Sequence, residues 1–363
     1  MIPLLDRHFA RRLAGTYFRT LLVLVALFVF VDLMTRRRNQ ILELNVPLGT
    51  VAEYYLCYIP GILNEFQIAS LAMLVSVLMV YGGAAQRHEI TSMLAAGVGL
   101  RRIARVPLAA GLLVTGLLFG MTETIGVEAS RRSAELEERY FMRIDKADRR
   151  TVSWANLEGD WSVHIMKFNR KAFTGENVLM LAFRDDVEEQ IRARRIYWDQ
   201  DAGNWVVEDG IRSKFHLDGE RPEEHVRIRQ AVAPIREDPG ALFAADRPSA
   251  AQTIAQLSAT AAIAKGRGMA VDSLNVDWHG KFAKPALCFV MVLIAIPFAM
   301  RLRSGGLGVG LGISIALGLA YLMVFAIAQA LGYIGRIEPF AAAWFANAAF
   351  AIAGVVLFAR TPT

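Results

Sequence analysis

The chain has few of the residues from which disulfide frameworks and metal sites are built. It contains two cysteines and six histidines in 363 residues. Cys57 and Cys288 both fall in apolar stretches, where we expect them to be small core residues. The histidines show neither H-E-x-x-H nor a Cys/His ligand spacing. We therefore expect no metal ion and no cofactor.

Motifs of nucleotide hydrolysis and nucleophilic catalysis are also missing. Gly280 and Lys281 are followed by Phe282 and lack the upstream glycine of a phosphate-binding loop, which excludes ATP binding of that kind. G-x-S-x-G is absent, so no nucleophile elbow is visible. The formal charge of +6 is too small to indicate nucleic-acid binding. We expect a non-catalytic protein.

Long apolar segments are what the chain has instead. A spanning helix needs about 20 mostly apolar residues. The segments that qualify are roughly 13–34, 52–82, 103–127, 281–300, 306–330 and 340–359. The second is too long for one straight span, and Pro60 and Gly61 are expected to break it. The fold class predicted is a six-helix membrane protein with a water-soluble domain inserted in its middle.

Arginines in the short loops predict the orientation, because basic residues accumulate on the cytoplasmic side. With both termini inside, that side receives Arg7, Arg11, Arg12, Arg87, Arg101, Arg102, Arg105, Arg301, Arg303 and Arg360. The opposite short loops receive only Arg36, Arg37, Arg38 and Arg336. We therefore expect both termini in the cytoplasm and the central domain outside.

Between the apolar blocks the pattern changes to the two-residue alternation of β-strands. The expected strands are 151–156, 161–168, 178–183, 194–198, 205–208 and 211–217. The run D-Q-D-A-G-N at 199–204 predicts a hairpin, and Gly210 predicts a further turn. Short strands with close turns are typical of a sandwich, barrel or jelly roll. We divide the chain into membrane helices at 1–127, a jellyroll-like domain with helical connectors at 128–275, and membrane helices at 276–363.

Arginines at the outer membrane surface are candidates for lipid binding. Arg36, Arg37 and Arg38 follow the first span, and Arg131 and Arg132 follow the third. Guanidinium groups match phosphate oxygens bidentately, so these residues are predicted to bind an anionic lipid. The alternatives are side chains that anchor the helix at the headgroups and, for the second pair, a solvated helix face.

A short helix at about 86–100, parallel to the membrane, is expected on the cytoplasmic side. Gly97 and Gly99 would end it. Arg87 and Glu89 lie at its start, either as solvated charges or as contacts with a cytoplasmic partner.

The fifth apolar segment carries small residues every fourth position. One series is Gly306, Gly310, Ser314 and Gly318, and the other is Gly308, Gly312, Ala316 and Ala320. Small residues at this spacing allow another helix to approach closely. We weigh two interpretations, packing within this chain and a seam with another subunit that opens as a gate.

The order of these features resembles the lipopolysaccharide-export permease family, LptF/LptG. A-Q-R-H-E-I-T-S-M-L-A-A-G-V-G-L-R-R-I at 85–103 is similar to a segment of that family between spans two and three, with Gly99 where the family has serine. The stretch at 123–139 resembles another, but Gly126 and Val127 replace its proline. Residues 278–301 and 338–350 look like spans four and six, and residues 4–20 resemble LptG more than LptF.

The resemblance implies a function and a set of partners. Two paralogous subunits would form a permease of the bacterial inner membrane, bound to a dimeric cytoplasmic ABC ATPase. Lipopolysaccharide would enter from the outer leaflet between span one of one subunit and span five of the other, and pass through periplasmic jellyroll domains to a bridge of similar domains. The helix with Glu89 would dock on the ATPase, and Arg87, Glu89 and Gly97 would couple the two.

Two other classes of protein remain as alternatives. A membrane-anchored sensor would bind a ligand with its β-domain, but no signalling domain is visible. A stand-alone secondary transporter would need ionisable residues within its spans, and these are nearly absent. Co-purification with an ATPase would separate the export permease from both.

Overall fold

The computed structural model describes residues 4–141, 150–157, 161–169, 172–184, 187–216, 224–242, 248–266, 270–301 and 306–360. The chain divides into two compact units. A helical unit contains Met1–Glu135, Ser249–Ser258 and Asp272–Thr363. A sheet unit contains Leu136–Pro248 and Ala259–Val271.

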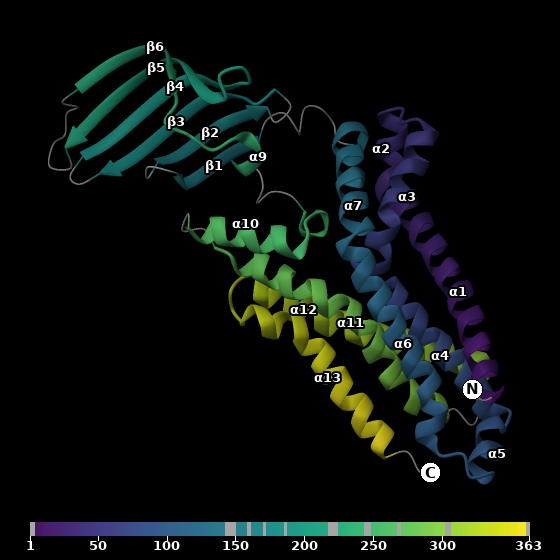
Figure 1. Ribbon diagram of the computed structural model, residues 1–363. Helices are drawn as coiled ribbons and strands as arrows, with labels where there is room; N and C mark the ends of the chain where they lie inside the picture. Colours follow the sequence, from purple (N-terminus) through teal and green to yellow (C-terminus); the bar gives the residue numbers. More distant parts are fainter. Residues whose placement is uncertain are drawn as a thin grey trace. The chain divides into compact units, whose positions relative to one another are not determined.

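Among the described residues, six helical segments are long and apolar enough to cross a membrane, as the sequence predicts. The first joins α1 (Leu4–Asp32), a π-helical turn (Leu33–Arg37) and α2 (Arg38–Glu43). The others are α4 (Ile68–Gln86), α6 (Leu100–Glu123), α11 (Asp272–Arg301), α12 (Gly306–Tyr333) and α13 (Pro339–Ala359). They lie side by side in the helical unit (Figure 1).

The long second segment breaks at a different place from the one predicted. Pro60 lies inside α3 (Leu48–Asn64), and α4 starts only after Gln67. Gln67 has φ +59°, a left-handed conformation that cannot continue a right-handed helix. Helix α3 thus ends at Asn64 and α4 starts after Gln67, while Pro60 is accommodated within α3.

The core of the helical unit forms around α4 and α11. Helix α4 and the part of α11 after Pro285 are apolar on nearly every side, as expected for helices that other helices surround. Met73, Leu74 and Val77 of α4 share a buried cluster with Leu287 and Met291 of α11. Cys288 is buried in the same cluster, in accord with its expected core role, and Cys57 is partly buried. Helices α1, α6, α12 and α13 cover this pair.

Different short helices and helix ends lie at the two ends of the helical unit. Figure 1 shows the start of α1, the short helix α5 (Glu89–Ala95) and the end of α13 at one end of this unit. The α5 end therefore collects segments far apart in sequence. Helices α2 and α3 and the helix α7 (Ile125–Leu136) lie toward the other end.

The inserted unit contains an antiparallel sheet, which confirms the predicted all-β insertion. Its strands are β1 (Arg150–Leu157), β2 (Trp161–Asn169), β3 (Thr174–Arg184), β4 (Val187–Asp199), β5 (Asn204–His216) and β6 (Glu224–Val232). Each pairs with the next in sequence order. The described strands thus form one meander, whereas a jelly roll folds its strands into two sheets.

The strands predicted at 205–208 and 211–217 form one continuous strand, β5. Gly210 lies inside β5 and not in a turn, because it pairs with Ala193 of β4. A Cβ atom at Gly210 would lie 2.8 Å from the carbonyl oxygen of Arg192, so glycine is required by close approach of the neighbouring strand. The hairpin at 199–204 is confirmed, since Asp199 pairs with Asn204.

The apolar face of the sheet forms the second core. Trp205, Ile165, Met180 and Ile196 are fully buried on it. Leu242, in the short helix α9 (Pro239–Leu242), packs against the same face. The Trp205 indole donates a hydrogen bond of 3.0 Å to the carbonyl of Glu237, which ties this covering segment to the sheet.

Candidate functional site

The arginine run at the end of α1 does not act as one group. Arg37 is buried, with 1% of its surface exposed. Its Nη2 donates to the Tyr54 hydroxyl at 2.6 Å and its Nη1 to the Gln40 Oε1 at 3.0 Å, while its guanidinium lies 4.8 Å from the Tyr54 ring centroid. Arg36 and Arg38 are exposed. Successive side chains of a helix point in different directions, so Arg37 faces α3 between two outward neighbours at the end of the π-helical turn.

A second contact fastens the same end of α1 to α3. The Tyr55 hydroxyl donates to the Asp32 carboxylate at 2.9 Å. Asp32 and Arg37 thus hold adjacent tyrosines of α3, and the lipid-binding prediction for this run rests on Arg36 and Arg38.

Arg131 and Arg132 are both engaged by groups of the helical unit itself. Arg131 donates to the Ala251 carbonyl at 3.0 Å and to Gln256 at 2.8 Å. Arg132 donates to Glu53 at 2.9 and 3.0 Å. The structure therefore gives the pair a bridging role between helices.

The predicted cytoplasmic helix is α5, shorter than the 86–100 expected. Gly97 ends it with φ +82°, and the Val98 N–H bonds to the Met93 carbonyl at 3.0 Å, the closing contact of a Schellman motif. Gly99 is instead the residue before α6. The role predicted for Gly97 as a helix stop is thus visible in the backbone.

Glu89 links α5 to the start of α1. Its carboxylate accepts from Arg87 Nε at 2.6 Å and from Arg12 Nη1 at 3.4 Å. Burial raises the pKa of Glu89, but the hydrogen bond and charge of Arg87 and the charge of Arg12 outweigh it, so its pKa lies below the usual value. Glu89 is therefore ionised and paired within this chain.

The two small-residue series of α12 lie on different faces. Gly310, Ser314 and Gly318 are buried, and a Cβ at Gly318 would lie 2.9 Å from Leu71 of α4. These three residues therefore pack within the chain and do not form a seam with another subunit. Gly306, the fourth member of the series, is the first residue of α12.

The other series faces away from the core. Gly308, Gly312, Ala316 and Ala320 are exposed. A Cβ at Gly312 would have no described atom within 4 Å. This face is open to a neighbour.

A cluster of charged residues that the motifs did not predict lies between α3, α6 and α11. Lys281 is 5% exposed; its Nζ donates to the Gln252 carbonyl at 2.6 Å and lies 3.7 Å from the Glu123 carboxylate. Lys284 pairs with Glu65. Each residue lies near the end of an apolar segment, a position that by itself indicates only the membrane boundary. Sequence gives no signal that they meet.

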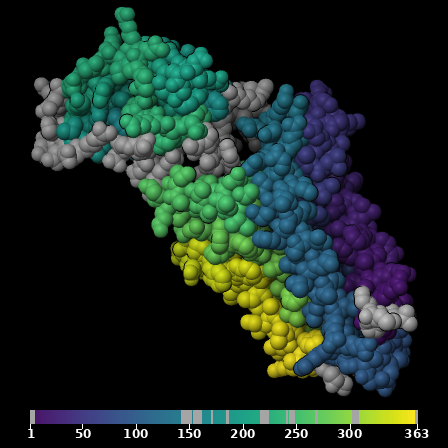
Figure 2. All heavy atoms as spheres, in the orientation of Figure 1, coloured from purple at the N-terminus to yellow at the C-terminus, as the bar shows by residue number. Residues whose placement is uncertain are grey.

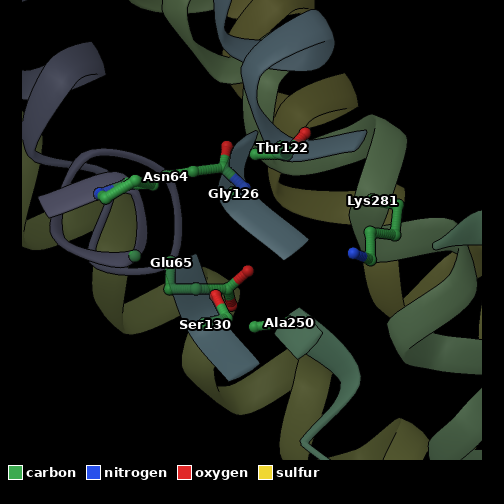
Figure 3. A pocket seen from close by; sticks show the side chains of 9 residues that line it. Asn64, Glu65, Thr122, Gly126, Ser130, Ala250 and Lys281 are labelled. Carbon is green, nitrogen blue, oxygen red and sulfur yellow. The ribbon is translucent and has the colours of Figure 1, made fainter. Parts of the chain in front are cut away.

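A small pocket adjoins this cluster (Figure 3). The residues that line it are Pro60, Gly61, Asn64, Glu65, Thr122, Gly126, Ser130, Ala250 and Lys281. Asn64 is 3% exposed, and neither atom of its amide has a hydrogen-bond partner among the described residues. Figure 3 shows the Lys281 ammonium and the Glu65 carboxylate directed toward the same space.

The comparison with protein families covers nearly the whole chain. The model of the family described as lipopolysaccharide export system permease LptF/LptG matches residues 7–360. The chain belongs to the LptF/LptG family. No curated protein sequence matches it.

Membership of the LptF/LptG family gives the class of function. The chain is a permease component of the lipopolysaccharide export system, and with its apolar helices it is a multi-pass protein of the inner membrane. Members of this family are permease subunits and generally not enzymes. Family membership implies partnership with a paralogous permease and an ATPase in the export complex.

Proposed function

We propose that the chain is one of two permease subunits of an ATP-driven exporter. It extracts lipopolysaccharide from the outer leaflet of the inner membrane and passes it to a periplasmic bridge. Hydrolysis takes place in a separate dimeric cytoplasmic ABC ATPase that binds at the α5 end. The observation that carries this proposal is the family match over residues 7–360.

The surface of α1 supports entry of a lipid along this helix. In the first span, Leu5–Glu43, no residue of the most apolar window is buried. Phe18, Leu22 and Phe30 are 66%, 71% and 61% exposed. Figure 2 shows the α1 atoms at the surface of the helical unit. An apolar face that the chain itself leaves uncovered suits acyl chains or the helix of a second subunit.

The exposed arginines at the end of this face suit the charged part of the same lipid. Arg36 and Arg38 follow the apolar stretch within one helical turn, and both side chains are exposed. Lipid phosphates at the membrane surface would meet them when the acyl chains lie along α1. Both termini then lie in the cytoplasm and the sheet unit in the periplasm, as the loop arginines predict.

Reconstitution tests the proposal. The chain is co-expressed with its paralogous permease and ATPase, and the purified complex is placed in vesicles containing lipopolysaccharide. We expect ATP-dependent release of lipopolysaccharide to a soluble periplasmic jellyroll acceptor. ATP hydrolysis without release would contradict the proposal. Purification without any ATPase would favour the sensor or secondary-transporter alternatives.

A further inference from the structure

Three charged residues fasten one short segment to the membrane helices. This segment, residues 249–256, is called the return connector here. It contains a 3-10 turn (Ser249–Ala251) and the start of α10 (Ile254–Gly266), and it lies in sequence between parts of the sheet unit. Its backbone provides three contacts to these residues, and its side chains add two more, from Arg131 to Gln256 and from Ser249 to Asp277 of α11.

Each of the three residues comes from a different helix. Lys281 of α11 donates to the Gln252 carbonyl at 2.6 Å, and Arg131 of α7 donates to the Ala251 carbonyl at 3.0 Å. The Glu123 carboxylate of α6 accepts the Ile254 N–H at 3.0 Å. Side-chain anchoring of backbone groups fixes the path of a segment whatever its own sequence, so these contacts determine where the connector runs.

The contact of Lys281 with Glu123 of α6 is longer than a hydrogen bond. Its ion pair with Glu123 is 3.7 Å long, and Glu123 Oε1 is buried with no hydrogen-bond partner among the described residues. On the other side lies the pocket with Glu65 and the unpartnered Asn64. Leaving buried polar groups unpaired is unfavourable, and such groups in a folded protein often mark a functional position.

We propose that Lys281 is a positioning residue with two states. In the state described, it latches the return connector to α6 and α11. In the second state its ammonium turns across the pocket to Glu65 and Asn64, and the connector is released. The second state rests on the proposed function, because we assign the release of the connector to the transport cycle. The latched state does not depend on the proposed function.

Hydrogen exchange of the connector tests the latch. The probe is the amide exchange of residues 249–256, measured by mass spectrometry on the full complex in lipid nanodiscs. Lys281→Met with Glu123→Gln removes the latch without leaving a buried charge unpaired, and the glutamine keeps an acceptor for Ile254. We expect exchange to become about tenfold faster in this peptide, since local opening costs less free energy. Lys265→Met, on the exposed part of α10, is the matched control and leaves exchange unchanged.

Two outcomes separate a latch from simple packing. In the wild type, ATP turnover should speed exchange of the connector, whereas Asn64→Leu should keep it slow during turnover and lower lipid release. Asn64→Leu retains the Lys281 contact with Gln252, so its resting exchange should equal that of the wild type.

Unchanged exchange in the Lys281/Glu123 double variant overturns the latch. Normal release by Asn64→Leu overturns the second state. Absence of lipid release by the wild-type complex contradicts the proposed function and leaves the resting exchange result valid.

Discussion

Arg37 and its two neighbours show how one helical turn assigns different roles to identical side chains. Arg37 is buried against Tyr54, while Arg36 and Arg38 are exposed. The sequence predicts the basic run and its place at the end of a span. It does not predict the π-helical turn, because the extra residue depends on how α1 packs against α3.

Replacing Arg37 should destabilise the fold and not only lipid binding. Arg37→Leu leaves the Tyr54 hydroxyl buried without its donor, which costs about 1–3 kcal/mol. Thermal unfolding in detergent should show a lower midpoint. Arg38→Leu, which changes an exposed neighbour, is the control and should unfold like the wild type. Equal midpoints for both variants would contradict the structural role of Arg37.

Arg36 and Arg38 together should carry the contact with the lipid phosphate. Charge reversal of these two to Glu, with Arg37 kept, should strongly reduce photo-crosslinking of lipopolysaccharide to α1 while the complex still purifies with its ATPase. Arg→Glu replaces attraction to phosphate with repulsion at the same place. Undiminished crosslinking would leave the two residues as headgroup anchors. Reversal of all three would not separate lipid binding from folding.

At the scale of elements, α5 illustrates what local sequence determines. Gly97 marks the helix end because a left-handed residue is needed there, and glycine signals it directly. The partner of Glu89 on α1 is not predictable, since Arg12 lies 77 residues away in sequence. The same holds for the break at Gln67, where a non-glycine residue adopts positive φ.

The strands also show that local sequence does not reveal contacts between distant segments. In β3, β4 and β5 the buried face includes Gly175 and Val178, Ala193 and Ile196, and Val207 and Gly210. Buried positions three residues apart interrupt the alternation at the same row of neighbouring strands, as the pairings of β4 with β3 and β5 confirm. A sequence reading by alternation therefore divides β5 into two strands. Only the neighbouring strands reveal that it is continuous.

Reversing the charge of Glu89 should loosen α5 and lower ATPase activity of the complex. Glu89→Lys would place a third cation beside Arg87 and Arg12, whereas Glu89→Gln removes the charge without repulsion. ATP hydrolysis by the purified complex should fall more for Lys than for Gln. Native rates for both variants would leave Glu89 with its contacts inside the chain and without a coupling role.

The same contact should persist over a wide range of pH. Because the folded pKa of Glu89 lies below its ordinary 4.5, its stabilising contribution is present above that value and is lost only as pH falls through the lower folded pKa. Hydrogen exchange of α5 should therefore stay constant from about pH 8 to about pH 5, after correction for intrinsic rates. A marked loss of protection near pH 6 would point to another titrating group.

At the scale of the whole molecule, the helical unit presents faces that the chain does not cover. The exposed α1 face and the exposed small-residue series of α12 are apolar and lie on helices at the margin of the bundle. In a membrane such faces meet lipid or another subunit. Sequence periodicity finds both series of α12 but cannot tell them apart, since that depends on which side α4 occupies.

Gly312 and Gly310 give a matched test of the seam between subunits. Gly310 is buried, so Gly310→Leu should destabilise the chain itself, contrary to what a gate-facing position would show. Gly312 is exposed with open space where its Cβ would lie, so Gly312→Leu should leave thermal unfolding of the subunit unchanged. If this face meets span one of the paralogous subunit, the leucine holds the helices apart, because close approach depends on small residues. Lipid release should then fall while ATP hydrolysis continues.

A cysteine introduced at Gly312, in a background lacking Cys57 and Cys288, should crosslink to the partner's first span. Crosslinking within the same chain, or normal release by Gly312→Leu, would remove this face from the lipid path and leave it to the surrounding bilayer.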